Sequence, residues 1–157
     1  MENKDQRNAQ VACLQKNLGA IRKIAGWTAE QLGEKIGVTK QTISNLENGK
    51  TPMTLTQYIA IRSVLDFEIQ TNKENTVLPQ VVEVLLNRYE EYSDEEREQL
   101  FENVKTIAAT AAGGIGGAAL AAVSAGLIGG ILGAPLLAVG GIAAGSVWLS
   151  KILKNKK

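Results

Sequence analysis

Short stretches with helical spacing of apolar residues, separated by glycines, dominate residues 11–65. The first stretch ends at Gly26 and the second ends at Gly37. Glycine is a common stop just beyond a helix, because it adopts a positive φ without steric cost. The pattern therefore predicts a bundle of short helices with sharp turns. Its apolar positions are Val11, Leu14, Leu18, Ile21, Ala25, Leu32, Ile36, Ile43, Leu46, Leu55, Tyr58, Ile59, Ile61, Val64 and Leu65.

Threonines stand where three of these helices should begin. Thr28 precedes Gln31 by three residues, which is the spacing of a capping box, and Thr39 and Thr54 precede the next two apolar stretches. Gly33 supplies a small residue where the second and third helices would cross. Short helices joined by a glycine-containing turn are the physical content of a helix-turn-helix.

The segment from Gly26 to Lys50 resembles the Cro/phage-repressor (XRE) family, and the resemblance covers about residues 14–67. It implies an all-α, lambda-repressor-like domain that binds double-stranded DNA, with a recognition helix over residues 39–48 in the major groove. It also implies an ion pair between Arg22 and Glu47 that fixes the first helix against the third. Ala29 departs from the family, which commonly has a phosphate-contacting glutamine there.

The same resemblance assigns side chains to DNA. Lysine can donate to guanine, and glutamine or asparagine can pair with adenine, so these residue types suit the contact with base edges. Phosphate contacts position the protein without recognising sequence. The candidate base contacts are Lys40, Gln41, Ser44 and Asn45. The candidate phosphate contacts are Thr39, Thr42, Asn48 and Lys50.

Charge changes sharply along the chain. Residues 1–66 hold nine Lys or Arg against six Asp or Glu, residues 67–106 hold four against ten, and residues 107–150 hold none. We therefore divide the chain into a DNA-binding domain (1–69), an acidic helical connector (70–106), a hydrophobic segment (107–153) and a basic tail (154–157). The weak positive charge of the first region leaves open that this fold serves as a protein-interaction module instead.

The connector is predicted to contain two helices after a polar linker at residues 70–76. The first carries a run of Val and Leu between Val77 and Leu86, and the second begins with a capping box formed by Ser93 and Glu96. We expect the apolar stripe of this region to pair with its copy in a homodimer or higher oligomer, because repressor-type domains commonly use two half-sites. The stripe on the second helix is Leu100, Phe101, Val104 and Ile107.

The residues available for catalysis are few. The chain has no histidine and a single cysteine, Cys13, so it lacks the usual general base and any thiolate cluster. We interpret the ten acidic residues of the connector as solvated helix faces. The prediction is a protein that is not an enzyme and that has neither a metal nor a cofactor.

The hydrophobic segment contains 44 consecutive residues without an ionisable side chain, of which 11 are Gly and 13 are Ala. A helix of that length is about 66 Å, roughly twice the hydrocarbon core of a bilayer. We therefore predict a transmembrane helical hairpin, over 107–132 and 136–153, that turns near Pro135 and keeps the lysines of the tail in the cytoplasm. Small residues four apart would let its helices approach closely. The predicted packing glycines are Gly113, Gly117, Gly126, Gly130, Gly133, Gly141 and Gly145.

These features lead to one principal hypothesis and two alternatives. The principal hypothesis is a transcriptional regulator tethered to the cytoplasmic membrane, with DNA and the lipid bilayer as its partners. One alternative makes the glycine-rich tract a membrane effector or pore, with the DNA-binding domain as its autoregulator. The other is a soluble, cytoplasmic, oligomeric scaffold that uses a repurposed helix-turn-helix fold.

Overall fold

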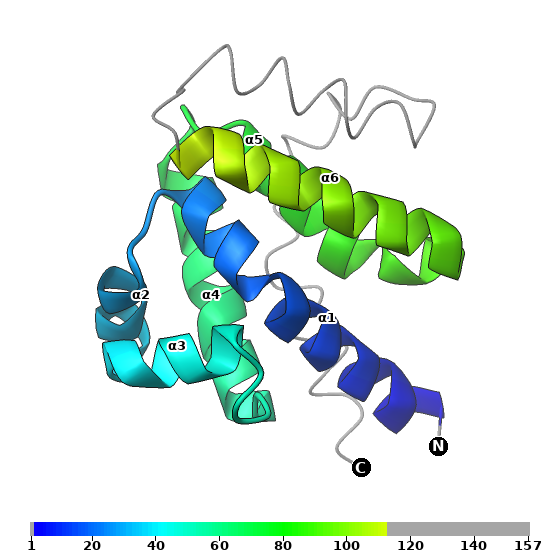
Figure 1. Cartoon of the computed structure of the whole chain (residues 1–157), viewed down its shortest axis with the longest axis horizontal. Helices are drawn as coiled ribbons and strands as arrows, with labels where there is room; N and C mark the ends of the chain where they lie inside the picture. The colour runs from blue at the N-terminus through cyan, green and yellow to red at the C-terminus, as the bar shows by residue number, and fades with distance from the viewer. Residues whose placement is uncertain (1, 113–157) are drawn as a thin grey trace.

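The computed structural model describes residues 2–112, and all regular structure in this part of the chain is helical (Figure 1). The helices are α1 (Glu2–Ala25), α2 (Ala29–Ile36), α3 (Lys40–Glu47), α4 (Leu55–Thr71), α5 (Val77–Val82) and α6 (Asp94–Ala112). A π-helical turn (Glu83–Asn87) and a 3₁₀ turn (Tyr89–Glu91) join α5 to α6.

The predicted helix starts and stops are confirmed. At the start of α2, the Thr28 hydroxyl accepts from the amide of Gln31 at 3.0 Å, and the Gln31 side chain accepts from the amide of Thr28 at 2.9 Å. Thr39 and Thr54 cap α3 and α4, and Ser93 and Glu96 form the capping box of α6. The stops at Gly26 and Gly37 have φ values of 84° and 77°.

Two helices extend beyond the apolar pattern that predicted them. Helix α1 starts at Glu2, although its apolar spacing starts only at Val11. Helix α4 continues to Thr71, so the polar linker is shorter than predicted. Polar residues continue a helix that is already formed at little cost, which is why apolar periodicity locates helices better than their ends.

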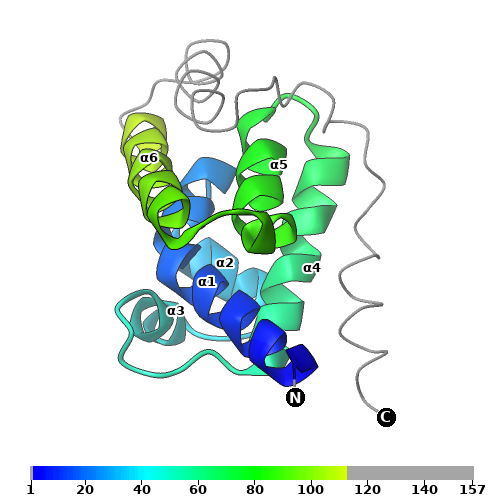
Figure 2. The ribbon, with the colours of Figure 1, turned by 90° about the vertical axis from the view of Figure 1, so that its right-hand side faces the viewer.

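The apolar stripe of α5 and α6 packs against α1 of the same chain. Leu100 is 1% exposed, and Val104 and Ile107 are fully buried in one core that also contains Leu14 and Leu18 of α1. Figure 2 shows α6 and α4 on opposite sides of the bundle. The stripe that we expected to face a second copy thus has an intramolecular partner, because α1 presents apolar residues on more than one side.

Polar contacts tie the same elements together. The Cys13 thiol donates to the carbonyl of Leu85 at 3.2 Å, and the Lys16 ammonium lies 4.5 Å from the ring centre of Phe101. Asn75, in the loop before α5, donates to the carbonyl of Ile24 at 2.9 Å and accepts from the amide of Leu78 at 3.1 Å. The linker is therefore anchored at the end of α1.

The start of the uncharged tract belongs to this core. Ile107 is fully buried and Ala108 is 3% exposed, and both lie on α6. Within residues 2–112, no helix is both long enough and apolar enough to cross a bilayer. The rest of the predicted hairpin, with all of its packing glycines from Gly113 to Gly145, lies outside the described residues.

Candidate nucleic-acid interface

The turn between α2 and α3 depends on a close backbone approach at Gly33. A Cβ atom at this position would lie 2.6 Å from the carbonyl oxygen of Val38. The amide of Val38 donates to the carbonyl of Gly33 at 2.9 Å, and Gly37 between them has the left-handed conformation. A small residue is therefore needed at position 33, as expected for the helix crossing, because backbone atoms rather than side chains occupy the space of a Cβ.

Helix α3 has one buried face and one polar face. Ile43 and Leu46 are at most 1% exposed and hold the helix on the core. The candidate base contacts lie away from that side: Lys40 and Gln41 are exposed, and Ser44 and Asn45 are half-buried. The structure therefore gathers all four on one helix, with the two most exposed in its first turn.

Hydrogen bonds between polar side chains order this face. The side-chain nitrogen of Gln41, Nε2, donates to the side-chain oxygen of Asn45 at 3.0 Å. Asn48 donates to the Ser44 hydroxyl at 3.3 Å, and the hydroxyls of Thr39 and Thr42 are 3.0 Å apart. The side chains of the face are held in place before any ligand is bound.

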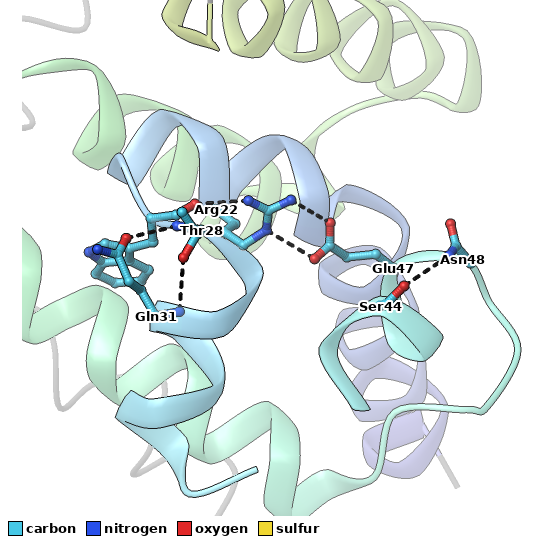
Figure 3. A network of polar contacts seen from close by, with 7 residues as sticks. Arg22, Thr28, Gln31, Ser44, Glu47 and Asn48 are labelled. Carbon is cyan, nitrogen blue, oxygen red and sulfur yellow. Dashed lines mark hydrogen bonds and ion pairs between the residues drawn. The ribbon is translucent and has the colours of Figure 1, made fainter. Parts of the chain in front are cut away.

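An ion pair fixes α3 to α1 (Figure 3). Nε and Nη2 of Arg22 donate to the two carboxylate oxygens of Glu47 at 3.0 and 2.9 Å, and Nη1 donates to the carbonyl of Trp27 at 2.8 Å. The two charged side chains are only 14% and 15% exposed. Two parallel bonds of this kind set the orientation of both groups, so the structure places Arg22 and Glu47 as the resemblance implied.

Gln15 was not identified from the sequence, yet it holds the loop that follows α3. Its side-chain nitrogen, Nε2, donates to the backbone carbonyls of Leu46 at 3.1 Å and Thr51 at 2.7 Å. Its oxygen accepts from the amide of Met53 at 2.9 Å. The loop carries Lys50, a candidate phosphate contact that is exposed. Because all three partners are backbone groups more than 30 residues away, no sequence motif marks this glutamine.

The Cys13 thiol does not provide a reactive group in this structure. Cys13 is 4% exposed, and burial raises its pKa to about 12, against a smaller opposing effect of the hydrogen bond from Asn17. Thiolates rather than thiols act as nucleophiles and metal ligands. Among residues 2–112, no group of three or more His, Cys, Asp or Glu side chains is placed to hold a metal ion.

Comparison with known proteins agrees with this geometry. The family model described as "Helix-turn-helix" matches residues 18–71. Antitoxin HipB of Escherichia coli K12 is 33% identical over 63 residues, which are 40% of this chain and 72% of that protein. Antitoxin HipB of Escherichia coli O6:H1 is 32% identical over 63 residues, which are 40% of this chain and 67% of that protein. No solved structure matches the chain.

Proposed function

Because the chain belongs to the helix-turn-helix family of the XRE type, we propose that it is a sequence-specific DNA-binding transcriptional regulator held at the cytoplasmic membrane. DNA binding is supported above all by the polar face of α3, which lies at the surface while contacts on the other side of the helix hold it in place. The Arg22–Glu47 pair holds it to α1, and Gln15 holds the loop after it. A rigid element places polar groups in the major groove at little cost in conformational entropy.

The bond between Gln41 and Asn45 suggests which base they recognise. It uses one N–H of Gln41 and the oxygen of Asn45. The oxygen of Gln41 and the amide nitrogen of Asn45 are not used by this bond, so the pair offers one acceptor and one donor side by side. Adenine presents the complementary N6 donor and N7 acceptor in the major groove. We expect a preference for adenine opposite these two residues.

Other residues of the same surface suit the DNA backbone. Thr39, Thr42 and Asn48 lie at the two ends of α3, and Lys50 extends from the next loop. These groups can donate to phosphate oxygens and set the register of the helix on the duplex. Two such surfaces, one from each subunit of a homodimer, would meet half-sites about 34–36 Å apart.

Substitutions separate base contacts from phosphate contacts. In the full chain, Gln41→Ala should reduce the discrimination between a selected operator and random DNA by about 1–3 kcal/mol. Lys50→Ala should weaken binding to both duplexes alike and lower the slope of log affinity against log salt by about 1. Fluorescence anisotropy on both duplexes measures the two effects. Equal losses on operator and random DNA for Gln41→Ala would refute its role in base recognition.

The membrane part of the proposal is supported by the composition of the C-terminal tract. After Ala112, the chain continues without an ionisable group to Ser150, and lysines follow at 151, 154, 156 and 157. Glycine and alanine suit membrane helices, whose backbone groups pair internally and whose small residues allow close packing. Because Ile107 and Ala108 are buried in the core, the proposed anchor begins after them.

A further inference from the structure

One face of α1 meets α3 and the loop that follows it through polar contacts. Figures 1 and 2 both show α1 between α6 and α3. The face carries Gln15, Gly19 and Arg22, which are separated by four and three residues and therefore share one side of the helix. Arg22 binds Glu47, and a Cβ atom at Gly19 would lie 2.8 Å from Oε1 of the same carboxylate. The absence of a side chain at residue 19 thus makes room for Glu47 beside α1.

Gln15, on the same face, joins the two ends of the loop between α3 and α4. Its side-chain nitrogen donates to the backbone carbonyls of Leu46 and Thr51, and its side-chain oxygen accepts from the amide of Met53. A glutamine amide has two N–H donors, so these contacts use both of them. Leu46 lies before the loop and Met53 lies at its far end, and both are buried. One side chain of α1 therefore fixes the distance between the two ends.

The loop residues between these ends, 48–52, are all exposed. Lys50 lies in the middle, where its backbone amide donates to the carbonyl of Asn45 at 2.9 Å. Gly49, with a φ of 70°, turns the chain just before it. Exposed segments with little apolar burial open easily, so their order depends on the hydrogen bonds that hold them. The place of Lys50 relative to α3 therefore depends on Gln15.

We propose that Gln15 is a positioning residue for DNA binding, which holds the loop so that Lys50 meets a phosphate without the DNA having to order the loop first. The inference rests on the proposed function, because it takes Lys50 as a phosphate contact. Ordering a loose segment on binding lowers affinity, and a segment that is already ordered avoids this loss. Since phosphate contacts do not depend on base sequence, Gln15 raises affinity for every duplex alike.

Base recognition does not depend on Gln15 in this proposal. Gln41 lies in the first turn of α3, at the opposite end of the helix from the loop. The Thr39 hydroxyl caps that turn and accepts from the amide of Thr42 at 3.1 Å. Replacement of Gln15 should therefore leave the ratio of affinities for operator and random DNA unchanged.

A double-mutant cycle in the full chain, in mild detergent, tests the coupling between Gln15 and Lys50. Gln15→Met keeps the approximate length of the side chain and removes its N–H donors and its carbonyl oxygen. It is made alone and together with Lys50→Ala, and fluorescence anisotropy measures binding to a random duplex and to a selected operator. The matched control is Gln6→Met, which makes the same change at an exposed position of α1.

Gln15→Met should weaken binding to both duplexes by roughly two- to tenfold, the range for ordering one more flexible group on binding. Gln6→Met should have no such effect. In the Lys50→Ala background, Gln15→Met should change affinity by less than about twofold, because the contact that it positions is already missing. A merely structural role would give the same loss in both backgrounds. Parental affinity in Gln15→Met, an equal loss with and without Lys50, or a loss confined to the operator overturns the proposal.

Hydrogen exchange shows whether the variant has lost the loop contact or the whole fold. In Gln15→Met, the amide of Met53 should exchange faster than in the parent, whereas the amides of α6 should keep their protection. If protection is also lost in α6, Gln15→Asn takes its place in the cycle. Asparagine keeps the amide but is one carbon shorter, so it cannot reach all three backbone groups.

The random duplex separates failure of this inference from failure of the proposed function. A parent protein that binds random DNA without preferring any sequence would remove sequence-specific regulation, and the coupling of Gln15 to Lys50 would still be measured on that duplex. A parent that prefers its operator, with Gln15→Met equal to it in affinity, would leave the proposed function standing and remove the role of Gln15. A parent that binds no DNA would overturn both.

Discussion

At the scale of single residues, Gly33 shows how tightly the helix-turn-helix is built. The Cβ of an alanine at this position would lie 2.6 Å from the backbone oxygen of Val38. Relieving such an overlap costs about 1–3 kcal/mol, whereas the better helix propensity of alanine returns about 1 kcal/mol. The net range is about 0–2 kcal/mol, and we expect Gly33→Ala to lower the free energy of unfolding by roughly 1 kcal/mol.

Urea unfolding of the full chain measures this effect. Trp27 fluorescence, in a Trp148→Phe background, reports on the helix-turn-helix region. Glu34→Ala, at an exposed position of α2, is the control and should change stability by less than about 0.5 kcal/mol. A Gly33→Ala protein as stable as its parent would show that the turn can shift to admit a Cβ.

Cys13 should make the stability of the protein fall at alkaline pH. Burial raises its pKa in the fold to about 12, from an ordinary value of 9.0. Below pH 9 the thiol is protonated in both states and has no effect on the pH dependence. Above pH 9 the unfolded chain loses the proton while the folded chain keeps it, so unfolding becomes easier by about 1 kcal/mol at pH 10.

The comparison of Cys13→Ala with the parent between pH 8 and pH 10 isolates this effect. Burial also raises the pKa of Tyr58 and Tyr92, but their ordinary value of 10.0 places their effect at higher pH. We expect the substitution to flatten the decline in stability over this interval. An unchanged slope in Cys13→Ala would mean that the thiol is not responsible.

The sequence identified local contacts well, and the one distant contact that it indicated, between Arg22 and Glu47, came from the family resemblance. Thr28 and Gln31 were predicted as a capping box because both partners lie within one turn of helix. Gln15 and Asn75 were not predicted, because each bonds backbone groups that only the folded chain brings near. The DNA contacts assigned to Lys40, Gln41, Ser44 and Asn45 stay predictions, based on their place in the motif.

At the scale of helices, the largest difference from expectation concerns α6. Periodicity revealed its apolar stripe, and nothing in that periodicity distinguishes a partner in the same chain from one in a second copy. The structure packs Leu100 and Val104 into the core shared with α1. The helix that we expected to be a connector is therefore a structural part of the DNA-binding unit.

Leu100→Ala tests whether α6 and the helix-turn-helix unfold together. Leu100 is 1% exposed, so its truncation should cost about 2–5 kcal/mol. Because the core is continuous, Trp27 should report the full loss, and its transition should coincide with that of helix content measured by circular dichroism. A Trp27 transition that does not move would show that α6 is an independent element.

At the scale of the whole molecule, we predict an integral membrane attachment through the C-terminal tract. The full chain, tagged at its N-terminus, should stay with membranes during alkaline carbonate extraction. A chain truncated after Ala112 should be released. We place the truncation there because Ile107 and Ala108 belong to the core, and a cut before them would unfold the control. Release of both chains into the soluble fraction would exclude the tether.

Selection from a random duplex library by the full chain, in mild detergent, tests whether α3 recognises a DNA sequence. We predict enrichment of a motif containing adenine, with two half-sites about 10 base pairs apart, and loss of that enrichment in the Gln41→Ala, Asn45→Ala double variant. Non-specific binding of both proteins to DNA should persist, since the phosphate contacts are unchanged. A library left unenriched by the parent protein, or the same motif selected by the double variant, would show that α3 does not recognise a DNA sequence through Gln41 and Asn45.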